Sequence, residues 1–530
     1  MRLALCVALA AAAPPAPEVV CDFARTNLTV DARYVSAVLD PSSLALDGAA
    51  SKSQFSDPRG AGLLNLTHPR LVALARRLAP ALLVVTGGRS NCVGVDGRDG
   101  YASPYCARKR YAGVPWRAIF KNVPSRDGRR YAGTASARNF AALGAFAEAT
   151  GTDLAWHLNP TIRDGAGVFD GAAAASLPAE TRAVLLFEEL HRRPSASKSK
   201  LKEAPTAASL AADFRSLRRS FAGTVVGVLN QDADEDAAWT DEAYAATRGD
   251  VDRVAFSYYA SSEFLPRKRK HEGCAAYGAA RTDVAAGVVD AGHGARFDAV
   301  AARYAALARR LGKPAPWAVA VAPCTHAPEG SGFGAADAVA GALWYAARRP
   351  SYDRRSTPTR RYADLLGRAA AAGVGLLARQ TLAGGVYGLL DSHTYEPTPS
   401  FDVAETFSAL FGPRVLRASC GAGQPGVTVY AHAGGGACVA VLVVNAGARR
   451  ARVRLPRHAG PRAVVRLEPA DGGGLAAPRF AKRAATGRRG SPSTRRRSPP
   501  PSRRLRWGCD VASGAPLKPP SRSIQRVEAS

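Results

Sequence analysis

The central part of the chain alternates between short, largely apolar runs and longer stretches in which apolar residues recur every three or four positions. The apolar runs predict strands buried on both faces, at residues 82–85, 154–159, 183–187, 224–230, 253–259, 317–321 and 374–380. The stretches between them predict amphipathic helices, such as one with Leu71, Leu74 and Leu78 on a single face. This alternation continues for more than 300 residues and predicts a parallel α/β fold. No Gly-rich phosphate loop follows the first of these strands, which favours a (β/α)8 TIM barrel, assigned to residues 19–410, over an open dinucleotide-binding sheet.

After residue 410 the pattern changes to short β runs separated by Gly-rich turns. These runs lie at residues 427–430, 438–445, 451–455 and 463–467. They predict a C-terminal antiparallel β-sandwich domain over residues 411–478. The remaining segment, 479–530, is rich in Arg, Ser and Pro, so it is predicted to be a disordered basic tail that supplies few apolar residues to the sandwich.

The first residues of the 530-residue chain have the features of a signal peptide. Arg2 precedes a short apolar run that ends in small residues, and a peptide covering residues 1–18 is predicted. The run is too short to span a bilayer. We therefore expect a secreted or extracellular-matrix protein, with a lysosomal or membrane-associated location as the alternative. The sequons at Asn27 and Asn65 agree with secretion.

The cysteine count also fits an oxidising compartment. Eight cysteines remain once Cys6 leaves with the signal peptide, and an even number predicts disulfides. Cys92 and Cys106 enclose a short loop rich in Gly and Asp, and we expect them to pair.

The net charge of +29 is divided between the tail and the rest of the chain. The tail has 14 Lys and Arg against two acidic residues, a net +12, which leaves +17 elsewhere. A basic surface attracts polyanions, and for a secreted protein we expect an acidic polysaccharide that is heparan sulfate-like or otherwise rich in uronate. Peripheral association with membrane or matrix would follow from the same surface. A nucleic-acid partner is not expected, because no base-stacking or groove-reading motif is present. No metal or cofactor is predicted.

The predicted strand at residues 183–187 runs directly into Glu188 and Glu189. In a barrel, the carboxyl ends of the strands face the active site, where an apolar wall raises the pKa of a carboxylate and suits it to general-acid catalysis. The alternative is that both carboxylates are the solvated end of a strand.

Polar and aromatic residues also follow the other predicted strands. They comprise Asp40, Arg89, Asn159, Glu189, Tyr258, Tyr259, Gln380, Tyr387 and Asp391. Carboxylates, amides and tyrosines together suit a sugar, whose hydroxyls need polar partners and whose faces need aromatic ones. Taken singly, a tyrosine at a strand end is more often half-buried packing.

Several segments resemble the heparanases of glycoside hydrolase family 79. Three carry the resemblance: 67–83 followed by Gly87-Gly88; Arg379-Gln380 followed by 384–387 and 389–391; and 398–401 followed by 410–416. Residues 34–40 and 156–159 are similar more loosely. The likeness extends over residues 19–470 and implies a barrel with a β-sandwich and retaining hydrolysis of glucuronide bonds in heparan sulfate-like chains. It also implies a set of substrate-binding residues, here Asp40, Arg89, Asn159, Gln380, Gly385 and Tyr387.

The resemblance implies two catalytic glutamates, of which this sequence matches one. Glu189 corresponds to the acid/base, although Glu188 and Leu190 replace the Asn and Pro of that motif. The family nucleophile follows a tryptophan by a few residues, whereas no carboxylate lies between Trp317 and Cys324. Glu329, in a Gly-rich loop, is the candidate nucleophile.

Three mechanisms remain open from the sequence. Retaining hydrolysis needs two carboxyl groups about 5–5.5 Å apart, which Glu189 could form with Glu329 or Glu188. An inverting mechanism would use water and a more distant carboxylate. The remaining hypothesis is a catalytically inactive family member that binds acidic polysaccharide in the same cleft.

Overall fold

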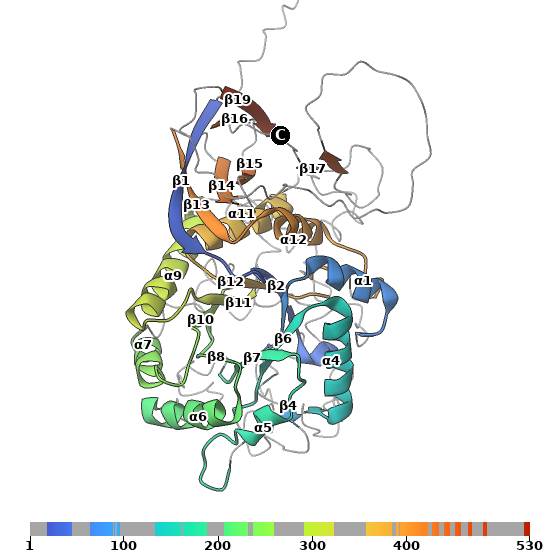
Figure 1. Ribbon diagram of the computed structural model, residues 1–530, viewed down its shortest axis with the longest axis vertical. Coiled ribbons are helices and arrows are strands. Elements are labelled where there is room, and N and C mark those ends of the chain that lie inside the picture. Colours follow the sequence, from blue (N-terminus) through green and yellow to red (C-terminus); the bar gives the residue numbers. More distant parts are fainter. Residues whose placement is uncertain are drawn as a thin grey trace, which may run out of the picture.

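The structure consists of a barrel and a second, smaller β domain (Figure 1). The computed structural model describes residues 18–44, 64–87, 90, 93–95, 133–160, 162, 164–187, 206–231, 237–258, 291–322, 357–383, 388–391, 393–421, 427–433, 439–445, 451–456, 465–468, 481–484 and 524–529. Three expectations lie outside these residues: positions 1–17 of the signal peptide, the Cys92–Cys106 pair and a helix near 335–347. Within the described part, none of the helices combines the length and apolarity needed to cross a membrane.

The barrel is a ring of parallel strands. Its strands are β2 (Val35–Leu39), β3 (Leu82–Val85), β6 (Asp153–His157), β7 (Thr181–Leu185), β8 (Thr224–Val226), β9 (Asn230–Gln231), β10 (Ala255–Ser257), β11 (Trp317–Val321) and β12 (Leu376–Gln380). They pair in the order β8-β7-β6-β3-β2-β12-β11-β10-β9. Because β8 and β9 belong to one segment, and Val226 also bridges to Arg253 just before β10, this order brings the sheet back on itself. The predicted (β/α)8 barrel is confirmed.

Helices surround this ring (Figure 1). The described ones are α1 (Pro69–Leu78), α4 (Ala137–Thr150), α5 (Ala172–Ala175), α6 (Ala207–Ser220), α7 (Ala237–Ala246), α9 (Ala291–Arg310), α11 (Thr357–Ala371) and α12 (Pro399–Leu410). In α1 the predicted apolar face is buried, and Pro69 occupies the first turn, where a missing N–H costs no hydrogen bond. Two short strands, β4 (Val93–Val95) and β5 (Gly133–Ala135), pair outside the ring, and a 3-10 turn (Pro41–Ser43) follows β2.

Side chains of alternating strand positions form two separate apolar clusters. The larger cluster lies between the strands and the helices. The smaller one fills the inside of the barrel and consists of Val38, Leu82, Val84, Ala155, Ala183, Leu185, Val226, Leu229, Ala255, Trp317, Val319, Ala320, Ala322, Leu376 and Ala378. Since strand residues alternate between faces, membership of the smaller cluster identifies the inward positions of each strand.

The second domain is built on a six-stranded sheet. Its order is β15-β14-β13-β1-β16-β19, from β15 (Val439–Asn445), β14 (Val427–Ala433), β13 (Arg414–Cys420), β1 (Glu18–Thr29), β16 (Ala451–Pro456) and β19 (Ile524–Ala529). All pairs are antiparallel except β1 with β16. A further hairpin pairs β17 (Val465–Glu468) with β18 (Ala481–Ala484). A disulfide between Cys21 and Cys420 joins β1 to β13.

Two boundaries differ from those predicted from the sequence. The barrel was expected to begin at residue 19, but β1 belongs to the second sheet, where Val19 and Cys21 are buried against Val453. Residues 479–530 were expected to be a disordered tail, yet β18 and β19 lie within it. The six-residue β19 contains no proline and pairs along β16, whose edge offers main-chain partners that overall composition cannot reveal.

Helix α11 holds the second domain against the barrel. The Asp364 carboxylate on this helix accepts hydrogen bonds from the hydroxyls of Thr428, at 2.5 Å, and Tyr430, at 2.6 Å, both on β14. It also pairs with Arg368, which in turn reaches Asp298 on α9 at 2.7 Å. Burial and the neighbouring Asp364 carboxylate raise the pKa of Tyr430 far above its usual value, so its hydroxyl remains a donor.

Candidate functional site

Asp40 and Gly87 lie next to each other where β2 and β3 end. Asp40 is two residues beyond the inward-facing Val38, and it is 94% buried. A Cβ on Gly87 would lie 3.4 Å from Asp40 Oδ2, so the Gly87 backbone lies directly against this carboxylate. Gly87 has a φ of +147°, which favours glycine at this position. The predicted site residue Asp40 is thus at the carboxyl end of the barrel.

Thr86 and His157 form a hydrogen bond inside the same end of the barrel. Each lies two residues beyond an inward-facing residue, Val84 on β3 and Ala155 on β6. Those two residues are directly paired, which brings Thr86 opposite His157. Thr86 Oγ1 lies 3.0 Å from His157 Nδ1, and both side chains are buried.

Asn159 and Gln380 complete the polar group that the sequence predicted and the structure describes. Asn159 is two residues beyond His157, and Gln380 is the last residue of β12, directly paired with Val38 of β2. Both follow inward-facing positions, and both are buried. Asp40, Asn159 and Gln380 therefore share the carboxyl end of the barrel, above an interior that is apolar.

Two other predicted strand-end residues have structural roles. Tyr258 packs edge-on against Phe297 of α9, with ring centroids 5.0 Å apart, so it faces the helices and not the inside of the barrel. One carboxylate oxygen of Asp391 accepts hydrogen bonds from the backbone N–H groups of His393 and Thr394, which organises the following turn. For Tyr258, the packing interpretation was the correct one.

Strand β11 contains a bulge at the position where the resemblance implies the nucleophile. Its residues 318 and 321 pair with residues 377 and 379 of β12, so three residues on one strand oppose two on the other. Ala320 has a φ of +57°, which is uncommon for a residue with a Cβ. As a result, Val319, Ala320 and Ala322 all belong to the interior cluster. Apolar side chains alone therefore face inward from this strand.

The other predicted site residues lie outside the described part of the chain. They are Glu188, Glu189, Arg89, Glu329, Gly385, Tyr387 and Tyr259. Their assignments remain predictions. Among the described residues, no cluster of three or more His, Cys, Asp or Glu side chains is arranged to hold a metal ion.

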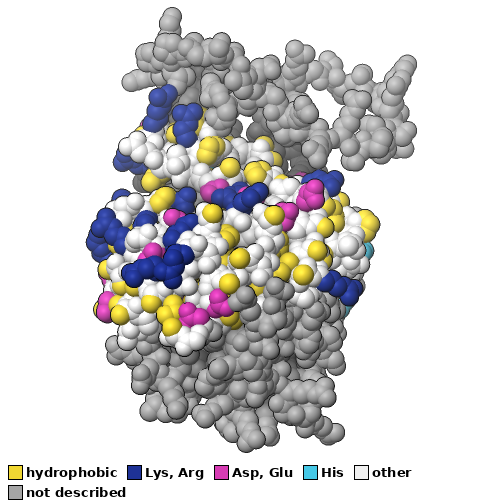
Figure 2. Space-filling view, turned by 60° about the horizontal axis from the view of Figure 1, so that its bottom comes forward, with side chains coloured by type: hydrophobic (Ala, Val, Ile, Leu, Met, Phe, Trp, Pro, Cys, Tyr) yellow, Lys and Arg dark blue, Asp and Glu magenta, His cyan; other side chains and the backbone are white. Residues whose placement is uncertain are grey.

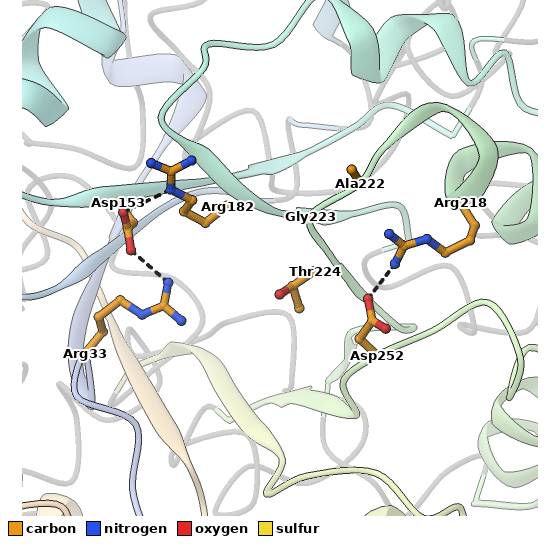
Figure 3. A pocket seen from close by; sticks show the side chains of 8 residues that line it. All are labelled: Arg33, Asp153, Arg182, Arg218, Ala222, Gly223, Thr224 and Asp252. Atoms are coloured by element: carbon orange, nitrogen blue, oxygen red, sulfur yellow. Dashed lines mark hydrogen bonds and ion pairs between the residues drawn. The ribbon is translucent and has the colours of Figure 1, made fainter.

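A pocket of about 700 Å³ lies at the opposite, amino-terminal end of the strands (Figure 3). Its charged side chains bind each other: Asp153 pairs with Arg33 at 2.9 Å and with Arg182 at 3.5 Å, and Arg218 pairs with Asp252 at 2.7 Å. These ion pairs connect the starts of neighbouring strands. Active sites of this fold lie at the carboxyl end, so we assign this pocket to barrel stability.

His157 is the functional candidate that the sequence interpretation missed. It lies within a predicted strand, at a position that alternation turns inward, and an ionisable residue there among Ala and Leu was the available signal.

Local sequence similarity connects the chain to two plant proteins. Over 85 residues it is 40% identical to heparanase-like protein 1 of Arabidopsis thaliana, and over 71 residues it is 39% identical to baicalin-β-D-glucuronidase of Scutellaria baicalensis. The matches span only 16% and 13% of the lengths of these relatives. No protein-family model matches the chain. The resemblance to heparanase-like proteins is confirmed over that limited part.

Solved structures share the fold over most of their length. A family 51 α-L-arabinofuranosidase from Bifidobacterium longum superposes with a TM-score of 0.52 at 11% identity, covering 88% of this chain and 95% of that enzyme. A family 51 arabinofuranosidase from Xanthomonas axonopodis pv. citri gives a TM-score of 0.50 at 13% identity, covering 84% and 89%. The architecture is therefore that of barrel glycoside hydrolases.

Proposed function

We propose that the protein is a glycoside hydrolase that cleaves glucuronide bonds in an acidic glycan. The observation that carries this proposal is the group of buried polar side chains at the carboxyl end of an otherwise apolar barrel: Asp40, Thr86, His157, Asn159 and Gln380. Polar groups in that position suit the hydroxyls of a sugar. The local similarity to a β-glucuronidase and to a heparanase-like protein supports the choice of a glucuronide.

Glu189 is the general acid/base in this proposal. Strand β7 ends at Leu185, and the carbonyl of Phe187 still accepts a hydrogen bond from Leu229 N at 2.8 Å. The residues that follow Phe187 in the sequence thus leave the barrel from its carboxyl edge. There, Glu189 would donate its proton to the glycosidic oxygen as the bond to the anomeric carbon breaks. A second carboxylate, for which Glu329 is the candidate, would attack that carbon or activate a water molecule.

Replacement of one carboxyl group tests the acid/base assignment. Glu189→Gln removes the transferable proton and should lower kcat on 4-nitrophenyl β-D-glucuronide at least about 100-fold, with the fold intact by circular dichroism. Glu148→Gln is the matched control, because Glu148 is exposed on α4 and far along the chain from the strand ends. Equal activity of wild type and the Glu189 variant would remove Glu189 from the mechanism.

The alternative proposal is an inactive relative that binds the glycan without cleaving it. The observation that favours it is β11, where Ala320 and Ala322 face inward and the sequence has no carboxylate between Trp317 and Cys324. An epoxide analogue of a glucuronide, which reacts with an attacking carboxylate, distinguishes the two proposals. Labelling at Glu329 would establish the retaining enzyme. Measurable affinity for the sugar without labelling or turnover would establish the binding protein.

We also propose that the substrate is a secreted or matrix polysaccharide rich in uronate or sulfate. The support is the net charge of +29, and Figure 2 shows several groups of Lys and Arg side chains on the described surface, with acidic side chains between them. Attraction between exposed charges is screened by salt. Retention of the full-length protein on a sulfated polysaccharide resin should therefore fall steeply as salt rises. Failure to bind at low salt would contradict this partner.

A further inference from the structure

His157, Thr86 and Asp40 form one row across three neighbouring strands. Val84 pairs with Ala155 and Val85 with Trp156, so Thr86 lies opposite His157. On the other side, the N–H of Thr86 donates to the carbonyl of Leu39 at 3.2 Å, which brings Thr86 next to Asp40. The row thus presents a carboxylate, a hydroxyl and an imidazole toward the inside of the barrel, at the end where its active site would lie.

The surroundings of this row give packing no reason for an imidazole. Leu185 is the residue of β7 paired with His157, and Ala155 and Val84 lie below the pair. A buried hydrogen bond contributes only about 1 kcal/mol net, and replacing both partners with apolar groups of similar shape is often nearly neutral. A barrel that needed only a stable core could therefore carry apolar residues at both positions.

We propose that His157 is a positioning residue that orients the Thr86 hydroxyl toward a glycan hydroxyl in the innermost part of the site. This inference rests on the proposed glycan-binding function. One hydrogen of the pair is shared between Thr86 Oγ1 and His157 Nδ1, which lie 3.0 Å apart, and either atom can donate it. Fixing this bond fixes the rotamer of Thr86 and leaves its oxygen one defined direction for a sugar hydroxyl. The neighbouring Asp40 carboxylate, held against Gly87, offers an acceptor beside it.

The expected effects follow from the loss of one oriented hydrogen bond. Thr86→Val removes the hydroxyl, and His157→Leu removes the group that orients it. Each should weaken binding of phenyl 1-thio-β-D-glucuronide, a ligand that resists hydrolysis, by about tenfold. Because both changes break the same interaction, the double variant should bind no more weakly than Thr86→Val alone. His157→Asn places a nitrogen or oxygen near the position of Nδ1 and should restore most of the affinity.

Isothermal titration calorimetry on the full-length protein measures these affinities, and thermal unfolding measures stability alongside. Thr150→Val is the matched control, since it removes a buried hydroxyl that bonds Phe146 O at 2.8 Å, at the end of α4. It should lower the Tm without changing the Kd. Wild-type affinity in His157→Leu, or additive losses in the double variant, would overturn the positioning role while leaving the glycan site in place. A wild-type protein that does not bind the ligand would overturn the proposed site itself, and this outcome is visible before any variant is made.

Discussion

The Asp364 carboxylate joins the two domains, and its replacement is a quantitative test of that junction. Asp364→Asn removes the negative charge and one of the two oxygens that accept from Thr428, Tyr430 and Arg368. Hydrogen bonds to a charged group contribute about 1.5–3 kcal/mol each when buried. The carboxylate is 22% exposed, so some of this is offset by water. We expect the free energy of unfolding to fall by about 2–4 kcal/mol.

Equilibrium urea unfolding followed by circular dichroism measures this loss as a lower midpoint. The matched control is Asp241→Asn on α7, because Asp241 is 42% exposed and pairs with Arg310 at 2.9 Å. An exposed ion pair of this kind contributes at most about 1 kcal/mol. If the Asp364 variant loses no more stability than the Asp241 variant, the junction does not depend on this carboxylate.

Two further predictions concern the same junction and the amino-terminal end of the barrel. Gly367→Ala should lower the Tm, by the equivalent of about 1–3 kcal/mol, because its new Cβ would collide with the ring of Tyr430; Gly249→Ala, with open space around it, should stay within about 0.5 kcal/mol of wild type. For Asp31, burial raises the pKa, but the hydrogen bonds and charge of Arg33 outweigh it and lower the pKa overall. Its contribution to stability is therefore present above the ordinary Asp pKa of about 4 and lost as the pH falls further. Urea midpoints measured from pH 7 to pH 3 should fall less steeply for Asp31→Asn than for wild type, and parallel curves would refute the assignment.

The barrel was predictable because its strands and helices carry strong and different periodicities. Runs such as residues 82–85 and 317–321 are buried on both faces, and the helices between them are amphipathic. The same reasoning found Asp40, Asn159 and Gln380, since polar residues that follow parallel strands must share one end of the sheet.

The misses have physical causes that lie beyond local pattern. Strand β1 has an alternating pattern of buried and exposed residues, but its partners β13 and β16 lie about 400 residues away in the sequence, so nothing nearby reveals its domain. The bulge at Ala320 reverses which residues of β11 face inward, and alternation read from the sequence cannot include it. His157 was overlooked because its importance depends on which residue of β3 lies opposite, and only the register supplies that.

The position of β1 and β2 has a consequence for how the protein is made. Strand β2 closes the barrel against β12, and β1 joins the second sheet beside β13, where Cys21 and Cys420 are 399 residues apart. Ribosomes add about 5–20 residues per second, so the first strands wait on the order of tens of seconds for partners made last. During synthesis, the unpaired edges of β1 and β2 are therefore the natural targets for chaperones, and a chain released before residue 376 can close neither domain.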